Sequence, residues 1–387
     1  MDLRYTHAEQ AFRAELRQWL SDTLPGLPDK PSPEDWPGRR AYDTHWQRLL
    51  FDAGYAGVDW PVAGGGRGST PVEELIFKEE LERAHAPYVG VNFVGLLHAG
   101  PTVIAEGTPE QRERFLPPIL RGDEVWCQGF SEPGAGSDLA SMRTRAVRDG
   151  DHYVLNGQKQ FISGAGQSDL YVVMVRTGSD GPGGISTIVV EAGTPGLSFG
   201  ANERKMGWNA QPTRAVIFEN ARAPVANRLG DEGIGFKIAM AGLDGGRINI
   251  AACSLGGAQS ALDQSLTYMK ERKAFGKRLD EFQALQFRLA DMATELEAAR
   301  TLVWRAAAAL DRRDPEATKL CAMAKRFGTD VGFEVANQAL QLHGGYGYLS
   351  EYGMEKIVRD LRVHQILEGT NEIMRLIVAR KLIEDAR

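Results

Sequence analysis

The chain has 387 residues, which is enough for two or three domains with well-formed cores. A net charge of −6 at pH 7 argues against nucleic acid or an anionic membrane as the main partner. No apolar stretch is long enough to cross a membrane, and the three cysteines (Cys127, Cys253 and Cys321) lack the spacing of a disulfide framework or a zinc site. The N-terminus lacks the apolar core of a signal peptide, so we expect a cytoplasmic protein without membrane insertion.

The first third of the chain has the patterns of helices. Apolar residues recur at i, i+4, i+7 and i+8 from Phe12 to Leu20, which is the stripe of an amphipathic helix. Thr70–Glu73 and Thr108–Gln111 each have the sequence of a capping box with proline at the first helical position. The helices that follow these two boxes are expected over residues 74–84 and 112–120.

Between residues 124 and 228 the patterns change to those of short strands. Tyr153–Leu155 and Gln160–Ile162 flank Asn156-Gly157, a dipeptide typical of a two-residue hairpin turn. Further β-branched runs cover residues 170–175, 185–191 and 215–218. Short strands at this density predict a compact β-barrel or sandwich, and Ala223–Val225 is interpreted as the linker that follows it.

The last third is helical again, in longer pieces. Segments with few helix breakers cover residues 248–272, 280–311 and 315–342, and a final helix has apolar residues on one face from Ile373 to Leu382. We therefore predict an α+β multidomain protein rather than an alternating βαβ fold. The predicted parts are an N-terminal helical domain (1–122), a central β-barrel domain (123–228) and a C-terminal four-helix bundle domain (229–387).

The common catalytic signatures are absent from the sequence. It has no G-x-G-x-x-G, no P-loop, no G-x-S-x-G and no H-E-x-x-H. If the protein is an enzyme, a cofactor held in another way is expected to supply the difficult chemistry.

Two segments are unusual. Gly129–Asp138 is rich in small residues and hydroxyls, which is typical of a turn but also lets backbone amides approach a flat polar ring. Gln341–Tyr348 contains Gly344-Gly345, which can end a helix or, through successive amides, form an anion-binding nest for a pyrophosphate. These local patterns leave both interpretations open.

Both segments resemble the signature motifs of the acyl-CoA dehydrogenases, and the first departs only at Phe130, where a smaller aliphatic residue is usual. The resemblance extends to Phe161–Ser163, Arg272–Gly276 and Leu367–Asn371, in the family's order and over nearly the whole chain. It implies the family's fold, FAD as cofactor and an oxidoreductase that acts on a CH–CH bond of an acyl-CoA.

The resemblance also implies which residues contact the flavin and the substrate. Gln128 and Ser131 would lie along the isoalloxazine, Phe161 would cover its face, and Ser163 would contact its edge near N5. The residues that correspond to those holding the rest of FAD are Arg272, Phe275, Phe282, Gln283, Gln341, Gly344, Gly345, Thr370 and Asn371. Those that correspond to substrate-binding positions are Ser137, Asp244, Arg247 and Gly369. In the family the ADP part of FAD is held by a neighbouring subunit, which implies a homotetramer built as a dimer of dimers, or a mixed tetramer.

Glu368 corresponds to the family's catalytic base. From the local sequence alone, a Glu near the start of a helix would be interpreted as a charge that compensates the helix dipole. Some relatives place the base just before the arginine that corresponds to Arg247, but here that position is Gly246. Glu368 is therefore the only candidate at either location, and Gly246 leaves room for a branched or ring-bearing acyl chain.

The reaction implied is α,β-dehydrogenation of an acyl-CoA to the trans-2-enoyl-CoA, with α-proton removal by Glu368 and hydride transfer to flavin N5. The expected electron acceptor is an electron-transferring flavoprotein or a similar protein. Two alternatives stay open: an oxygen-using acyl-CoA oxidase or flavin monooxygenase on the same fold, and a subunit of a mixed acyl-CoA dehydrogenase oligomer. Acyl chain length, pathway and acceptor are not specified by the sequence.

Overall fold

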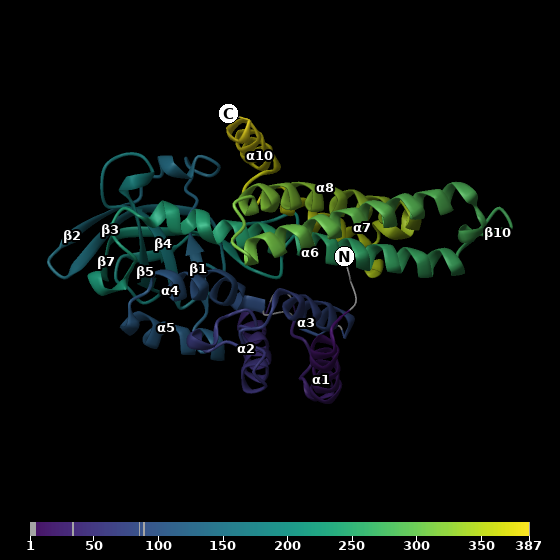
Figure 1. The fold of residues 1–387 in the computed structure, drawn as a ribbon, viewed down its shortest axis with the longest axis horizontal. Coiled ribbons are helices and arrows are strands. Elements are labelled where there is room, and N and C mark those ends of the chain that lie inside the picture. The colour runs from purple at the N-terminus through teal and green to yellow at the C-terminus, as the bar shows by residue number, and fades with distance from the viewer. Residues whose placement is uncertain (1–4, 33–34, 85, 88–89, 387) are drawn as a thin grey trace. The chain divides into compact units, whose positions relative to one another are not determined.

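The computed structural model describes residues 5–32, 35–84, 86–87 and 90–386. The chain divides into two compact units. The first contains residues 1–204 and 210–242, and the second contains residues 205–209 and 243–387. Each unit is described by itself below, with the elements labelled as in Figure 1.

The N-terminal part of the first unit is helical, as predicted. Its helices are α1 (His7–Thr23), α2 (Trp36–Asp52), α3 (Pro71–Arg83), α4 (Gly100–Glu106) and α5 (Pro109–Arg121). The predicted capping boxes at Thr70 and Thr108 both form, because each threonine hydroxyl accepts from the amide three residues on and the side chain there accepts from the threonine amide. The helices share a core with the sheet of the same unit, in which Trp46 and Trp126 are fully buried.

The rest of the first unit is an eight-stranded, mostly antiparallel sheet. Its strands are β1 (Trp126–Gly129), β2 (Arg145–Asp149), β3 (His152–Ser163), β4 (Leu170–Arg176), β5 (Ile185–Glu191), β6 (Leu197–Phe199), β7 (Thr213–Pro224) and β8 (Arg228–Leu229). The order is β6-β7-β3-β2-β4-β5-β8, and β1 adds to β4 in parallel. Strand β4 is buried along its whole length, which explains its continuous apolar sequence.

The hairpin predicted at Asn156-Gly157 is wrong. Strand β3 runs straight through these residues and pairs with β7 on both sides of them, with a register shift at Leu155/Asn156. Gly157 has φ of 145°, a conformation that favours glycine but here lies within the strand, and the Asn156 side chain is bonded to Asn220 of β7 rather than to its own turn. The hairpin is instead at Gly150, between β2 and β3, where φ is 63°.

The linker predicted at Ala223–Val225 is also wrong in part. Ala223 and Pro224 end strand β7 and pair with Tyr153 and His152 of β3. Proline is tolerated there because it stands at the last position of the strand, where no further ladder bond is needed.

The second unit is a bundle of long helices. They are α6 (Gly235–Glu271), whose first turns belong to the first unit, α7 (Gln283–Asp311), α8 (Ala317–His343), α9 (Met354–Arg362) and α10 (Asn371–Asp385). The short strands β9 (Lys273–Ala274) and β10 (Lys277–Arg278) pair between α6 and α7. Many core residues of α6, α7 and α8 are alanines, and these small side chains let the helix axes approach closely. The helical, β, helical order predicted from the sequence is confirmed.

A segment between β6 and β7 also belongs to the second unit. Within residues 205–209, the Trp208 amide donates to Asp360 of α9, with 2.6 Å between N and Oδ1, and the Trp208 ring nitrogen donates to His364 Nε2 at 3.1 Å.

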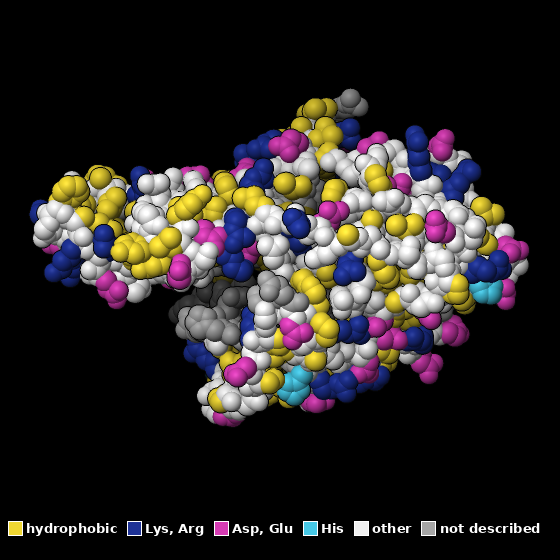
Figure 2. All heavy atoms as spheres, turned by 180° about the vertical axis from the view of Figure 1, so that it is seen from behind, with side chains coloured by type: hydrophobic (Ala, Val, Ile, Leu, Met, Phe, Trp, Pro, Cys, Tyr) yellow, Lys and Arg dark blue, Asp and Glu magenta, His cyan; other side chains and the backbone are white. Residues whose placement is uncertain are grey.

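None of the described helices is both long and apolar enough to cross a membrane. On the face shown in Figure 2, positive and negative side chains are intermixed.

Candidate active site

In the first unit, the loop after β1 carries the first signature segment. Its centre is a tight turn, in which the Glu132 and Ala135 amides donate to each other's carbonyl oxygens at 2.9 and 3.1 Å. The amide of Gln160 in β3 donates to the Ser131 carbonyl oxygen at 2.9 Å. Ser131 is therefore tied to the strand that carries the other predicted flavin contacts.

A buried ion pair lies under this loop. The Lys159 side chain is completely buried, and its Nζ donates to Glu132 Oε1 at 2.9 Å and to the Phe130 carbonyl oxygen at 3.1 Å. Burial lowers the pKa of Lys159 to about 8, against the opposing effect of Glu132. Burial alone would raise the pKa of Glu132, but the Lys159 charge and the hydrogen bonds at the carboxylate outweigh it and hold that pKa below its usual value. Both groups are therefore ionised near neutral pH.

The other predicted flavin contacts lie on strands β1 and β3. Phe161 has φ of 59° and a side chain that is 69% exposed, at a break in the pairing of β3 with β7. A bulky residue in this backbone conformation costs on the order of 1–3 kcal/mol, and such residues cluster at functional sites. Ser163 and Gln128 are partly buried in β3 and β1, and Ser137 is exposed in the loop. An exposed aromatic ring fits the role predicted for Phe161.

In the second unit, Glu368 stands on the short loop before α10. Both Glu368 and Gly369 have positive φ, of 55° and 91°, and the Thr370 side chain then caps the helix by accepting from the Ile373 amide. Glu368 is therefore two residues outside the helix, on a backbone held in a left-handed conformation. This fits a carboxylate presented to a ligand better than one that compensates the helix dipole.

The substrate-binding pair predicted on α6 is in contact. Arg247 is 4% exposed and its Nη1 donates to Asp244 Oδ1 at 2.5 Å, while Asp244 Oδ2 accepts from the Thr318 hydroxyl of α8 at 2.7 Å. Gly246 is buried in the same turn of α6. The guanidinium of Arg247 is thus held in a buried position by Asp244, which Thr318 of α8 holds in turn.

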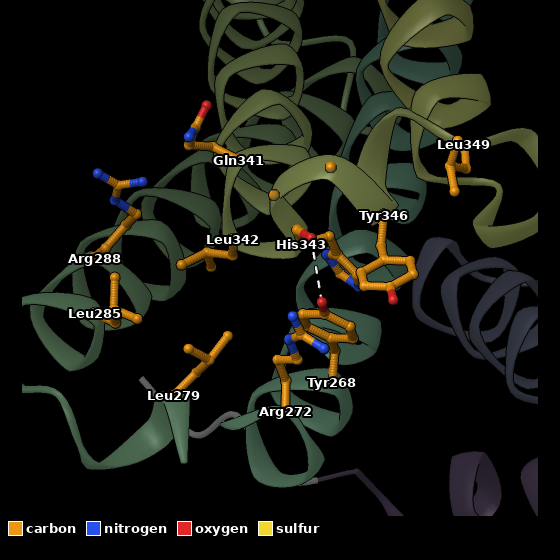
Figure 3. Close-up of a pocket in the computed structure, with 12 residues that line it drawn as sticks. Tyr268, Arg272, Leu279, Leu285, Arg288, Gln341, Leu342, His343, Tyr346 and Leu349 are labelled. Carbon is orange, nitrogen blue, oxygen red and sulfur yellow. Dashed lines mark hydrogen bonds between the residues drawn. The ribbon is translucent and has the colours of Figure 1, made fainter. Parts of the chain in front are cut away.

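A pocket of about 690 Å³ lies where α6, α7 and the end of α8 meet (Figure 3). It brings together Arg272, Gln341, Gly344 and Gly345, four of the residues predicted to hold the cofactor. Its wall is lined by Tyr268, Arg272, Leu279, Leu285, Arg288, Gln341, Leu342, His343, Gly344, Gly345, Tyr346 and Leu349. Phe275, Phe282 and Gln283 do not line it, and Phe275 is 95% exposed.

Aromatic rings give this pocket one flat side. The Tyr268 ring stacks on His343 with 4.4 Å between centroids, and its hydroxyl donates to the His343 carbonyl oxygen at 3.3 Å (Figure 3). The Arg272 guanidinium lies 5.3 Å from the centre of the Tyr346 ring. Two guanidiniums, adjacent glycine amides and aromatic surfaces match the chemistry of a nucleotide diphosphate, so the residues fit the ADP part of FAD.

Several residues around these sites were not found from the sequence. Lys159 and Lys325 are both completely buried, and Tyr268 and Arg288 line the pocket. A signal did exist for the lysines, since each stands at a core position of its element, where a charge is unusual. Within the described residues, no group of three or more His, Cys, Asp and Glu side chains could hold a metal ion.

The family follows from comparison with known proteins. The N-terminal, middle and C-terminal domain models of acyl-CoA dehydrogenase match residues 6–123, 127–221 and 233–383. The chain therefore belongs to the acyl-CoA dehydrogenase family. It is an FAD-dependent oxidoreductase that acts on acyl-CoA thioesters by α,β-dehydrogenation.

Individual relatives are similar over most of the chain. The mitochondrial isobutyryl-CoA dehydrogenases of Bos taurus and Dictyostelium discoideum are each 48% identical to it over 92% of its length, and it covers 85% and 86% of them. The crystal structure of an acyl-CoA dehydrogenase from Geobacillus kaustophilus matches with a TM-score of 0.87 at 35% identity, covering 99% of this chain and 100% of that one.

Proposed function

We propose that this enzyme dehydrogenates a short acyl-CoA branched at the α-carbon, such as isobutyryl-CoA. The observation that carries the proposal is the 48% identity to isobutyryl-CoA dehydrogenases over 92% of the chain. Gly246 agrees with it, because a glycine on the α6 turn of Asp244 and Arg247 leaves room for a branch. Isobutyryl-CoA still carries the one α-hydrogen that the base removes as a proton, and its methyl groups carry the β-hydrogens that leave as hydride.

Glu368 is proposed as the base that removes this α-proton. It stands on a strained loop, and proton transfer to its carboxylate leaves negative charge on the thioester oxygen. A backbone N–H of the loop, that of Glu368 itself, is proposed to donate to this oxygen and to stabilise the charge. FAD, when bound, supplies the acceptor for the β-hydrogen as hydride.

The remaining predicted residues are proposed to hold these two partners. Ser131, Phe161 and Ser163 would fix the flavin, with Gln128 beside them, and the pocket around Arg272 and Gly344 would take the ADP part. Arg247 and Asp244 would face the CoA portion of the substrate, with Ser137, while Gly369, Thr370 and Asn371 complete the loop around the base.

A homotetramer that passes electrons to an electron-transferring flavoprotein completes the proposal. Large apolar side chains are exposed on the helical unit, among them Phe275 (95%), Tyr348 (80%) and Phe287 (59%), and yellow side chains gather on the bundle in Figure 2. A second copy of the chain would cover them.

Because the described cysteines form no disulfide, we also propose a reducing compartment such as the cytoplasm, although the two relatives are mitochondrial.

The test is anaerobic bleaching of the purified flavoprotein by a panel of acyl-CoAs. We expect isobutyryl-CoA to reduce the flavin faster than butyryl-CoA or octanoyl-CoA, and Glu368→Gln to keep its flavin but lose at least about 1,000-fold in the rate of bleaching. Glu384→Gln, which removes an exposed carboxylate at the other end of α10, is the control and keeps the normal rate. Preference for octanoyl-CoA contradicts the proposed substrate, normal bleaching by Glu368→Gln contradicts the base, and rapid release of hydrogen peroxide would indicate an oxidase.

A further inference from the structure

Lys325 of α8 is completely buried behind the loop that carries Glu368. Its Nζ donates to the Gly369 carbonyl oxygen at 2.7 Å and to Asn371 Oδ1 at 3.0 Å. A lysine is rarely buried to this extent, because its charge loses hydration unless other groups compensate it. Both acceptors here belong to the four residues that follow the proposed base.

Helix α8 also fixes the Asn371 side chain from a second direction. The Asn371 amide donates to Thr329 Oγ1 at 3.0 Å and to Asp330 Oδ1 at 2.7 Å. Lys325 and Thr329 are four residues apart, with Asp330 next, so all three meet the loop from one face of the helix. Asn371 is 3% exposed, so its side chain is engaged with α8 and only its backbone is left for other contacts.

The loop that leads into these anchored residues has a left-handed backbone conformation. Glu368 and Gly369 have φ of 55° and 91°, and a residue with a side chain adopts such a conformation only where its surroundings impose it. Lys325 contacts this segment at two points: its Nζ donates to the carbonyl oxygen of the residue directly after Glu368 and to the side chain three residues after it.

We propose that Lys325 is a positioning residue for the base: its ammonium holds the Gly369 carbonyl and the Asn371 side chain, so that the Glu368 carboxylate leaves the loop in one direction. The inference rests on the proposed role of Glu368. Lys325 itself does not touch the reacting atoms. It acts on the geometry of proton transfer, in which a displacement of about 1 Å can cost about 100-fold in rate.

The charge of Lys325 gives the proposal a pH signature. Burial lowers the pKa of Lys325 to about 8, opposed by the carboxylates of Glu368, Asp330 and Glu372 and assisted by the positive charge of Arg247. The ammonium is therefore lost as the pH rises through about 8, and its hydrogen bonds weaken. We expect the bleaching rate of the wild-type enzyme to fall above this pH.

The experiment compares Lys325→Met with Lys319→Met in the holoenzyme. Methionine keeps much of the lysine stem but removes the ammonium, and Lys319 is on the same helix in an ion pair with Glu316 and Asp385. For Lys325→Met we expect a bleaching rate at saturating isobutyryl-CoA that is lower by about 100-fold, with the Kd of the substrate changed by less than about 3-fold. The alkaline limb of the pH profile should disappear, and Lys319→Met should match the wild type in all three measurements.

The outcomes separate this inference from the proposed function. If Glu368→Gln loses bleaching while Lys325→Met keeps the wild-type rate and pH profile, Lys325 is only structural and the inference is wrong. If Glu368→Gln bleaches normally, the base assignment fails first. If Lys325→Met does not retain its flavin, Lys325→Gln is measured in its place, because glutamine keeps a donor to Gly369. Its bleaching rate is expected to be about 10-fold below that of the wild type. An unchanged bleaching rate in this variant also overturns the inference.

Discussion

Replacing Lys159 by methionine would test how the loop of residues 129–138 is held to the sheet. The change leaves the Glu132 carboxylate buried, with a side chain that is 7% exposed and only the Arg143 and Thr144 amides as remaining donors, at 2.6 and 2.9 Å. Removing one partner of a buried ion pair costs about 3–5 kcal/mol, because the other charge stays without compensation. The two amides place the expected loss in the free energy of unfolding near the lower end, at about 3 kcal/mol.

Urea unfolding followed by circular dichroism at pH 7 measures this loss. Arg222→Met is the control, because it breaks an exposed pair with Asp149 in the same sheet and should cost less than about 1 kcal/mol. Adding Glu132→Gln to Lys159→Met removes the uncompensated charge, so the double variant should be more stable than Lys159→Met by at least about 1 kcal/mol. A loss below about 1 kcal/mol for Lys159→Met, or a double variant that is less stable still, would refute the reasoning.

Two further predictions concern the second unit. Gly246→Ala should lower the ratio of isobutyryl-CoA turnover to butyryl-CoA turnover by at least about 10-fold. Gly245→Ala is the control, because its added carbon meets no atom within 4 Å, and it should leave this ratio unchanged. Equal ratios in both variants would contradict the role of Gly246. Burial lowers the pKa of His364 from 6.5 to about 4. As the pH falls from about 6.5 to about 4, the unfolded chain takes up the proton before the folded chain does, so the free energy of unfolding decreases by about 3 kcal/mol. Urea titrations at pH 7 and pH 4 should show this loss reduced in His364→Gln, and the same pH dependence in both proteins would exclude His364 as its source.

The motifs account for the parts of the site that could be predicted. Arg272 is far in the chain from Gln341, Gly344 and Gly345, yet the resemblance assigned all four to FAD and the pocket contains all four. Phe275 belongs to the same motif but does not line the pocket of the single chain. The roles of these residues toward FAD, and that of Glu368 toward the substrate, stay predictions.

Local sequence was least informative where strand pairing between distant segments overrides a local preference for a turn or a linker. Asn156-Gly157 favours a turn by itself, but β3 continues through it because pairing with β7 on both sides satisfies more backbone groups than a local turn would. The same pairing draws Ala223 and Pro224 into a strand. Long-range hydrogen bonds of this kind have no signature in a window of a few residues.

The sequence by itself determined several of the helices, two of the capping boxes, the helical, β, helical order and the family, because periodicity, capping boxes and motifs are local or collinear features. It did not predict α2, α4 and α9. Only the tertiary structure decided which buried charges meet. Lys159 reaches Glu132 across 27 residues, and Lys325 reaches the loop of Glu368 from another helix. Such contacts depend on the closure of the whole fold around a charge, since burial is what makes a partner for the charge necessary.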